Sequence, residues 1–209
     1  MGNNLKANST TFSAKSPGRI KITEAVKELL GEKSYHEITW GEIAKKAEVS
    51  EALIYQHFKH KPGLLCGVLE DFMEAYVLEL KQELKGVYGA LNKLQRVIWA
   101  HIQSFNVNRV FAKILLLEIR GYPLFFDSGA YRIIQSYGDI LLDIIKEGVY
   151  YGEISEDIPP KDIRQIVLGT IEHQCLPRVI FDIEFSTDNL TDMACQTIFN
   201  GIMIERGRA

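Results

Sequence analysis

The sequence predicts an all-α fold of about nine helices. Along most of the 209 residues, apolar side chains recur at spacings of three and four, which is typical of helices with one buried face. Helix-start signals precede several of these stretches. Ser16 followed by Pro17, for example, places a capping residue before a proline at the first helical position. No segment shows the alternation of a β-strand, and the chain contains no internal repeat.

Composition indicates an ordinary globular protein. Hydrophobic residues make up 46% of the chain and charged residues 24%. No apolar run reaches the roughly 18 residues of a membrane span, so no membrane partner is expected. The polar N-terminus lacks the apolar stretch of a secretory signal. Three scattered cysteines are too few for a disulfide framework, and together these features predict a cytoplasmic location.

Two short helices are expected close together near the N-terminus. Thr39 and Glu42 have the spacing of a capping box, so a helix begins there and runs to about Ala47. Ser50 is the next capping residue, and a second short helix follows it as far as about Phe58. Two short helices separated by a tight turn are typical of a helix-turn-helix.

The other helices follow around clear breaks in the pattern. They are expected at about 17–31, 61–84, 91–105, 109–119, 131–151, 160–181 and 187–205. Proline removes an intrahelical hydrogen bond, so Pro177 is expected to kink or end its helix. The chain thus divides into a flexible arm (1–15), a helix-turn-helix domain (16–62) and a larger helical domain (63–209).

Charge is distributed unevenly between the two ends of the chain. Residues 1–65 carry 10 Lys and Arg against 7 Asp and Glu, whereas residues 66–209 carry 14 against 20. The basic end is the one suited to face phosphate. The asymmetry is modest, and it agrees with the helix-turn-helix prediction without establishing it.

The apolar pattern of the helix-turn-helix separates an inner from an outer face. The positions expected to hold the two helices together are Ile43, Ala44, Ala47, Val49, Ile54 and Phe58. The positions left for the outer face of the second helix are Glu51, Ala52, Leu53, Tyr55, Gln56 and His57. In a helix-turn-helix, that face enters the major groove of DNA.

From about Arg19 to Leu65, the chain resembles the tetracycline-repressor (TetR) family. The resemblance rests on the block Tyr55-Gln56-His57-Phe58, on Lys61, and on the spacing from Ile43-Ala44 to Val49-Ser50. It implies a three-helix DNA-binding domain, followed by a helical domain that binds a ligand and dimerises. It also implies a DNA-binding transcriptional regulator, and we expect a repressor.

The resemblance carries several roles over to individual residues. Thr39 and Trp40 are implied to contact the DNA backbone at the start of their helix, where free N–H groups suit phosphate. Tyr55 and His57 are implied to touch backbone or base edges, and Lys61 to pair with phosphate. Gln56 has the amide geometry for adenine, and Glu51 can accept from cytosine. The full set of expected DNA-binding residues is Thr39, Trp40, Ser50, Glu51, Ala52, Leu53, Tyr55, Gln56, His57 and Lys61.

Three positions depart from the family pattern. Glu48 stands in the turn where glycine is common, and a left-handed backbone there costs a non-glycine residue about 1 kcal/mol or more. Ala52 and Leu53 stand where glycine and threonine are common. Leu53 cannot donate a hydrogen bond, although it can touch a thymine methyl group.

The last two helices are expected to pair with their copies in a homodimer. By resemblance these helices, about 160–181 and 187–205, form a four-helix bundle across a two-fold axis. Small residues in their apolar stripes would allow close approach; they are Gly169, Thr170, Ala194 and Gly201. A two-fold dimer reads palindromic operator DNA. The alternative is that these stripes face only the core of one chain.

Aromatic and apolar side chains with a few polar groups in the 91–181 region suit a pocket for a small hydrophobic effector. The expected ligand-binding residues are His101, Phe105, Arg120, Tyr122, Phe126 and His173. The same residues also describe an ordinary core. Glu172, His173 and Cys175 do not point together on a helix, and no second cluster completes them, so neither a metal nor a cofactor is expected.

Two other functions remain to be weighed against a ligand-responsive regulator. The first is an enzyme or carrier on a helical scaffold, but the chain shows no nucleophile elbow, phosphate-binding glycine loop, HExxH motif or acid–base pair. The second is a DNA-binding adaptor whose C-terminal domain binds a protein partner rather than a small molecule.

Overall fold

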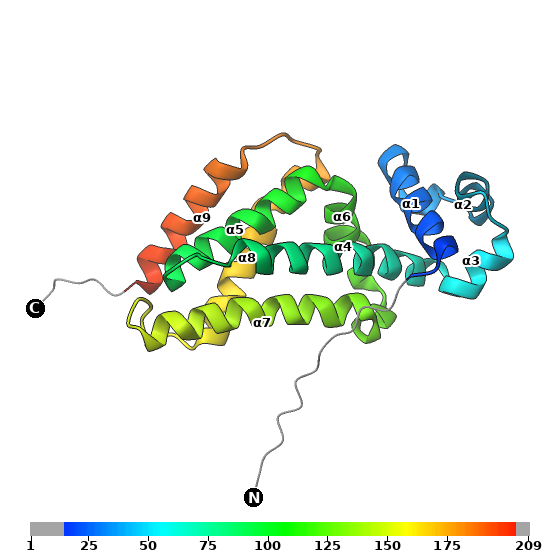
Figure 1. The fold of residues 1–209 in the computed structure, drawn as a ribbon. Coiled ribbons are helices and arrows are strands. Elements are labelled where there is room, and N and C mark those ends of the chain that lie inside the picture. The colour runs from blue at the N-terminus through cyan, green and yellow to red at the C-terminus, as the bar shows by residue number, and fades with distance from the viewer. Residues whose placement is uncertain (1–14, 204–209) are drawn as a thin grey trace, which may run out of the picture.

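The computed structural model describes residues 15–203, and they fold into helices (Figure 1). The α-helices within this range are α1 (Pro17–Glu32), α2 (Trp40–Ala47), α3 (Glu51–Phe58), α4 (Lys61–Glu83), α5 (Ala90–Val107), α6 (Arg109–Lys113), α7 (Gly129–Tyr150), α8 (Pro160–Ile180) and α9 (Thr187–Ile202). Shorter helical turns are η1 (Tyr35–Glu37), η2 (Ile114–Glu118, a π-helical turn), η3 (Ile119–Gly121) and η4 (Pro123–Asp127). The prediction of an all-α fold with about nine helices is confirmed.

The structure corrects several details of the predicted elements. Of the two outcomes expected at Pro177, an end of the helix is not found: α8 continues past this exposed residue to Ile180, close to the expected end at 181. The loop expected at 121–129 contains η4, and η1 was not predicted at all. Residues 1–14 of the expected arm, and residues 204 and 205 of the expected last helix, lie outside the described residues.

Helices α1 to α3 form a small head at one end of the molecule, and α4 runs from this head along the larger helical domain (Figure 1). The head has its own apolar centre, in which Ile22, Val26, Ile43 and Ile54 are fully buried. These residues come from all three helices of the head, which explains how two helices of only eight residues remain folded.

The larger domain is built around α4 and α7, which lie side by side, and around α5, which packs against α9 (Figure 1). The expected boundary after residue 62 falls within the first turn of α4. In residues 15–203, no helix is both long enough and apolar enough to cross a membrane.

Candidate nucleic-acid interface

Helix α2 begins with the predicted capping box. The Thr39 hydroxyl accepts a hydrogen bond from the Glu42 N–H at 3.3 Å, and the Glu42 carboxylate accepts one from the Thr39 N–H at 2.9 Å. The hydrogen bond from Lys33 and those from Thr39 lower the pKa of Glu42 to about 2. The first turn of α2 is therefore fixed, with Trp40 as its first residue.

The turn between α2 and α3 depends on a left-handed residue. Glu48 has φ of 54°, as the family pattern implied for this position. The Val49 N–H donates to the Ala44 carbonyl at 3.0 Å, and the Ser50 hydroxyl then accepts from the Leu53 N–H at 3.3 Å to cap α3. These hydrogen bonds thus stabilise a left-handed backbone at Glu48 that glycine would adopt with less strain.

Helix α3 is anchored from behind as predicted, because Ile54 and Phe58 are buried. The six residues expected on its outer face separate into two groups. Glu51, Ala52, Tyr55 and Gln56 are exposed, whereas Leu53 and His57 are half-buried.

Leu53 and His57 face the start of α1 rather than open solvent. A Cβ atom at Gly18 would lie 3.1 Å from Leu53 Cδ2, and His57 Nε2 lies 3.4 Å from the Ser16 hydroxyl. The spacing of a lone helix could not reveal this, because it depends on how α1 crosses α3. The exposed face of α3 is narrower than the sequence indicated.

Tyr55 and Trp40 join the two short helices on their outer side. Their rings lie 4.8 Å apart between centroids, and 48% of the Tyr55 surface remains exposed. A rigid aromatic pair of this kind holds the Tyr55 hydroxyl in a defined position. Two of the expected DNA-binding residues are therefore in direct contact, although they lie on different helices.

The start of α4 lies directly after α3. Lys61 is its first residue, and its ammonium group lies 5.5 Å from the centre of the Tyr35 ring. His60 caps the helix by accepting a hydrogen bond from the Gly63 N–H at 2.9 Å. Sequence reasoning missed this cap; its signal was the proline at the second helical position, Pro62.

Two of the residues expected to bind a ligand lie together in the core of the larger domain. His101 is buried, its Nδ1 lies 2.8 Å from the Tyr137 hydroxyl, and its ring meets the edge of Phe105 at 4.8 Å. Burial lowers the pKa of His101 to about 4. The imidazole is therefore neutral at physiological pH and packs as a polar aromatic group.

The depressed pKa of His101 predicts a pH-dependent stability. Below the ordinary value of 6.5 the unfolded chain takes up a proton that the folded chain refuses until about pH 4. The contribution of His101 to stability is thus complete above pH 6.5 and is lost as the pH falls towards 4. Between pH 7 and pH 5 the wild type is expected to lose about 2 kcal/mol more unfolding free energy than His101→Gln, measured by urea denaturation. Equal losses in both proteins would contradict a buried neutral imidazole.

The other four expected ligand residues lie nearer the surface than His101 and Phe105. Arg120 pairs through both of its terminal nitrogens with Glu172, at 2.8 and 2.7 Å, and is exposed. Tyr122 is half-buried, whereas Phe126 and His173 are exposed. Among residues 15–203, no three His, Cys, Asp or Glu side chains are grouped so that they could hold a metal ion.

A groove of about 370 Å³ lies between α4 and α5. Its wall includes Phe72, Tyr76, Trp99 and Ser104, and none of the six expected ligand residues. The Tyr76 and Tyr137 rings lie 5.7 Å apart, and the buried Tyr76 hydroxyl lies near enough to Tyr137 to interact with it, although it makes no hydrogen bond of ordinary geometry.

Helix α8 carries an apolar face that no other part of residues 15–203 covers. Ile166, Gly169, His173, Pro177 and Ile180 are all exposed and recur at spacings of three and four. On α9 the exposed residues Met193, Thr197 and Gly201 recur at a spacing of four. A Cβ atom added at Gly169 or Gly201 would meet nothing within 4 Å.

Comparison with known proteins matches two parts of the chain to known families. Residues 22–66 match the tetR family of bacterial regulatory proteins, and residues 69–201 match the C-terminal region of YsiA-like proteins, a TetR-type domain. The chain is 28% identical to the fatty acid metabolism regulator protein of Bacillus subtilis (strain 168) over 188 aligned residues. This alignment covers 90% of this chain and 97% of that protein.

Solved structures show the same fold. The transcriptional regulator FadR from Bacillus subtilis, crystallised with stearoyl-CoA, superposes with a TM-score of 0.79 at 27% identity, over 88% of this chain and 98% of that one. The fatty acid degradation regulator FadR from Bacillus halodurans superposes with a TM-score of 0.80 at 21% identity, over 94% and 100% of the two chains, and supports the fold alone. With a tetR-type head, a matching C-terminal domain and this shared architecture, the chain belongs to the TetR family of DNA-binding transcriptional regulators.

Proposed function

We propose that the protein is a repressor that binds palindromic operator DNA as a homodimer and leaves it when a long-chain acyl-CoA binds the larger domain. The observation that carries this proposal is the exposed face of α3, with Tyr55 held by Trp40. The similarity to regulators of fatty acid metabolism supports the choice of ligand class.

Operator recognition is assigned to α3 and to the two helix starts beside it. Tyr55, Gln56 and Glu51 are the exposed side chains that reach base edges, and Ala52 allows the backbone to come close. The capped starts of α2 and α3, at Thr39 and Ser50, offer free N–H groups to phosphate. Lys61 supplies a charge at the edge of this surface, while Leu53 and His57 serve mainly to hold α1 against α3.

Dimerisation is assigned to the uncovered faces of α8 and α9. Such a face, with Ile166 and Ile180 about half exposed, is costly to leave in water and suits a second copy of itself across a two-fold axis. The absence of side chains at Gly169 and Gly201 lets two helices approach closely. The two heads then face the same side, as palindromic half-sites require.

The ligand is assigned to the interior between α4, α5 and α7. The α4–α5 groove offers an entry, and the Tyr76 hydroxyl supplies a buried donor that makes no hydrogen bond of ordinary geometry to the neighbouring Tyr137. An acyl carbonyl would satisfy that donor, and the acyl chain would lie against Phe72 and Phe105. Arg120, Tyr122, Phe126 and His173 remain candidates for contacts nearer the surface.

The proposal is tested by binding to the DNA upstream of the protein's own gene. Gel shift with this fragment is expected to show a specific complex that micromolar stearoyl-CoA dissociates, while free CoA and short-chain acyl-CoA leave it intact. Thermal denaturation measures ligand binding independently of DNA. If stearoyl-CoA neither stabilises the protein nor weakens the complex, the ligand class is wrong. If no specific complex forms at all, the assignment of an operator to this DNA is wrong.

A further inference from the structure

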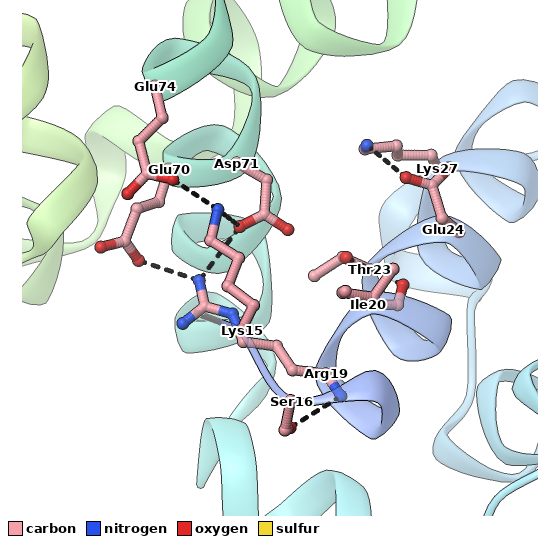
Figure 2. Close-up of polar contacts among 10 residues, drawn as sticks. All are labelled: Lys15, Ser16, Arg19, Ile20, Thr23, Glu24, Lys27, Glu70, Asp71 and Glu74. Atoms are coloured by element: carbon pink, nitrogen blue, oxygen red, sulfur yellow. Dashed lines mark hydrogen bonds and ion pairs between the residues drawn. The ribbon is translucent and has the colours of Figure 1, made fainter. Parts of the chain in front are cut away.

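Five charged side chains join the start of α1 to the third and fourth turns of α4 (Figure 2). Arg19 donates to Glu70 at 3.0 Å and to Asp71 at 3.2 Å. The Lys15 ammonium lies 2.5 Å from both Asp71 and Glu74. These side chains expose only 13 to 29% of their surface. The head is therefore tied to the larger domain by partly buried ion pairs, which salt screens less than surface pairs.

The same turn of α1 also contacts the recognition helix. The Arg19 guanidinium lies 5.8 Å from the centre of the Phe58 ring, and the Ser16 hydroxyl lies 3.4 Å from His57. Burial opposes the charge on Arg19, but its hydrogen bonds to Glu70 and Asp71 outweigh this, so its pKa is raised. A displacement of Arg19 thus reaches α3 directly.

Glu70 has a second neighbour on its other side. Its Oε2 atom accepts from Arg19, while its Oε1 atom lies so near Gly129 that a Cβ built there would be 2.2 Å away. Gly129 is the first residue of α7, where the positive end of the helix dipole favours a carboxylate. The Glu70 side chain therefore contacts both the first turn of α7 and the first turn of α1.

We propose that Glu70 is a positioning residue for the DNA-reading head, and that it carries displacements of the first turn of α7 into α1 and so to α3. The inference rests on the proposed function, because it describes how the effector region controls DNA binding. Helix α7 also supplies Tyr137, the partner of His101, so a ligand that moves α7 in the interior shifts Glu70 at its N-terminal end. Glycine at position 129 is what allows the carboxylate to sit there.

The test uses Gly129→Ala in the full chain. A methyl group at this position must displace the end of the flexible Glu70 side chain, while the new residue suits a helix at least as well as glycine. Amide hydrogen exchange in the first turn of α1 and in α3 is expected to rise about three- to tenfold, although the substitution lies about a hundred residues away in sequence. Gly121→Ala is the matched control, because a Cβ there meets nothing within 4 Å.

A second variant separates this link from a general structural effect. Glu70→Ala removes the carboxylate and should also accelerate exchange in α1 and α3. In the Glu70→Ala background, Gly129→Ala should then add nothing, because the side chain it displaces is gone. Additive effects of the two substitutions, or unchanged exchange in Gly129→Ala, would overturn the proposal.

Operator binding extends the same test and keeps it distinct from the proposed function. Affinity for the upstream DNA is expected to change about threefold or more in Gly129→Ala and to stay unchanged in Gly121→Ala. Exchange in α1 is read without DNA or stearoyl-CoA, so a failure of the ligand assignment leaves the test of Glu70 intact. A wild-type exchange pattern in Gly129→Ala would show that Glu70 does not link α7 to α1, even if the operator and the ligand were both confirmed.

Discussion

Tyr55→Ala is expected to lose specific operator binding while the protein remains folded. The ring is about half exposed and packs against Trp40 at a tilt, so its removal takes away both the proposed DNA contact and an aromatic contact between α2 and α3. The anchors Ile54 and Phe58 stay in place behind the helix. Operator affinity is expected to fall by about 100-fold or more, towards the level of nonspecific binding, as measured by titration against operator and random DNA.

Two controls make the Tyr55 result interpretable. Tyr88→Ala removes a tyrosine that is 84% exposed on the segment between α4 and α5, and it should leave operator affinity unchanged. Lys61→Ala should instead weaken operator and random DNA alike and reduce the salt dependence by about one counterion. A folded Tyr55→Ala protein that protects the operator as the wild type does would show that α3 does not read the groove through this face.

Gly169→Glu is expected to convert the proposed dimer into monomers. Nothing in residues 15–203 lies within 4 Å of a Cβ at this position, so the described part of a single chain accommodates the new side chain. In the proposed dimer, the carboxylate would be buried against Ile166 and its copy, at a cost of several kcal/mol. Light scattering at micromolar concentration should report half the wild-type mass. Operator affinity should fall by about 100-fold or more, because each head then binds alone.

Two further variants test which helices form the dimer interface. Gly201→Glu tests the α9 part of the same surface and should have the same effect, since its Cβ also meets nothing within one chain. Gly31→Glu introduces the same charge at an exposed position in the last turn of α1, in the head rather than on α8 or α9, and should remain dimeric. A monomeric wild type, or a dimeric Gly169→Glu protein, would rule out this arrangement.

The sequence was sufficient for elements whose signals are local. The caps at Thr39 and Ser50 and the buried anchors Ile54 and Phe58 were all predicted, because a cap and an apolar stripe depend on residues three or four positions apart. The bounds of α8 were predicted to within one residue at its end, although Pro177 within it was expected to kink or end the helix. The turn η1 carried no hydrophobic period strong enough to predict it.

Properties that depend on long-range packing could not be predicted. Leu53 and His57 belong by spacing to the outer face of α3, yet the crossing of α1 places them at its side. The ligand residues were chosen from aromatic and polar composition, and composition does not tell the interior position of His101 from the exposed position of His173. The ion pairs of Lys15 and Arg19 join residues more than 50 positions apart, so no local pattern marks them.

The continuity of α4 has a consequence for how the molecule folds. The first turns of this helix are buried and pack against both the head and the larger domain. Gly67 lies so close to Phe58 that a Cβ there would be 2.5 Å from the ring. A fragment ending before α4 would therefore leave Phe58 in water and give the head too small a core to persist. We therefore expect the head and the larger domain to unfold in a single cooperative transition, which calorimetry would show as one peak.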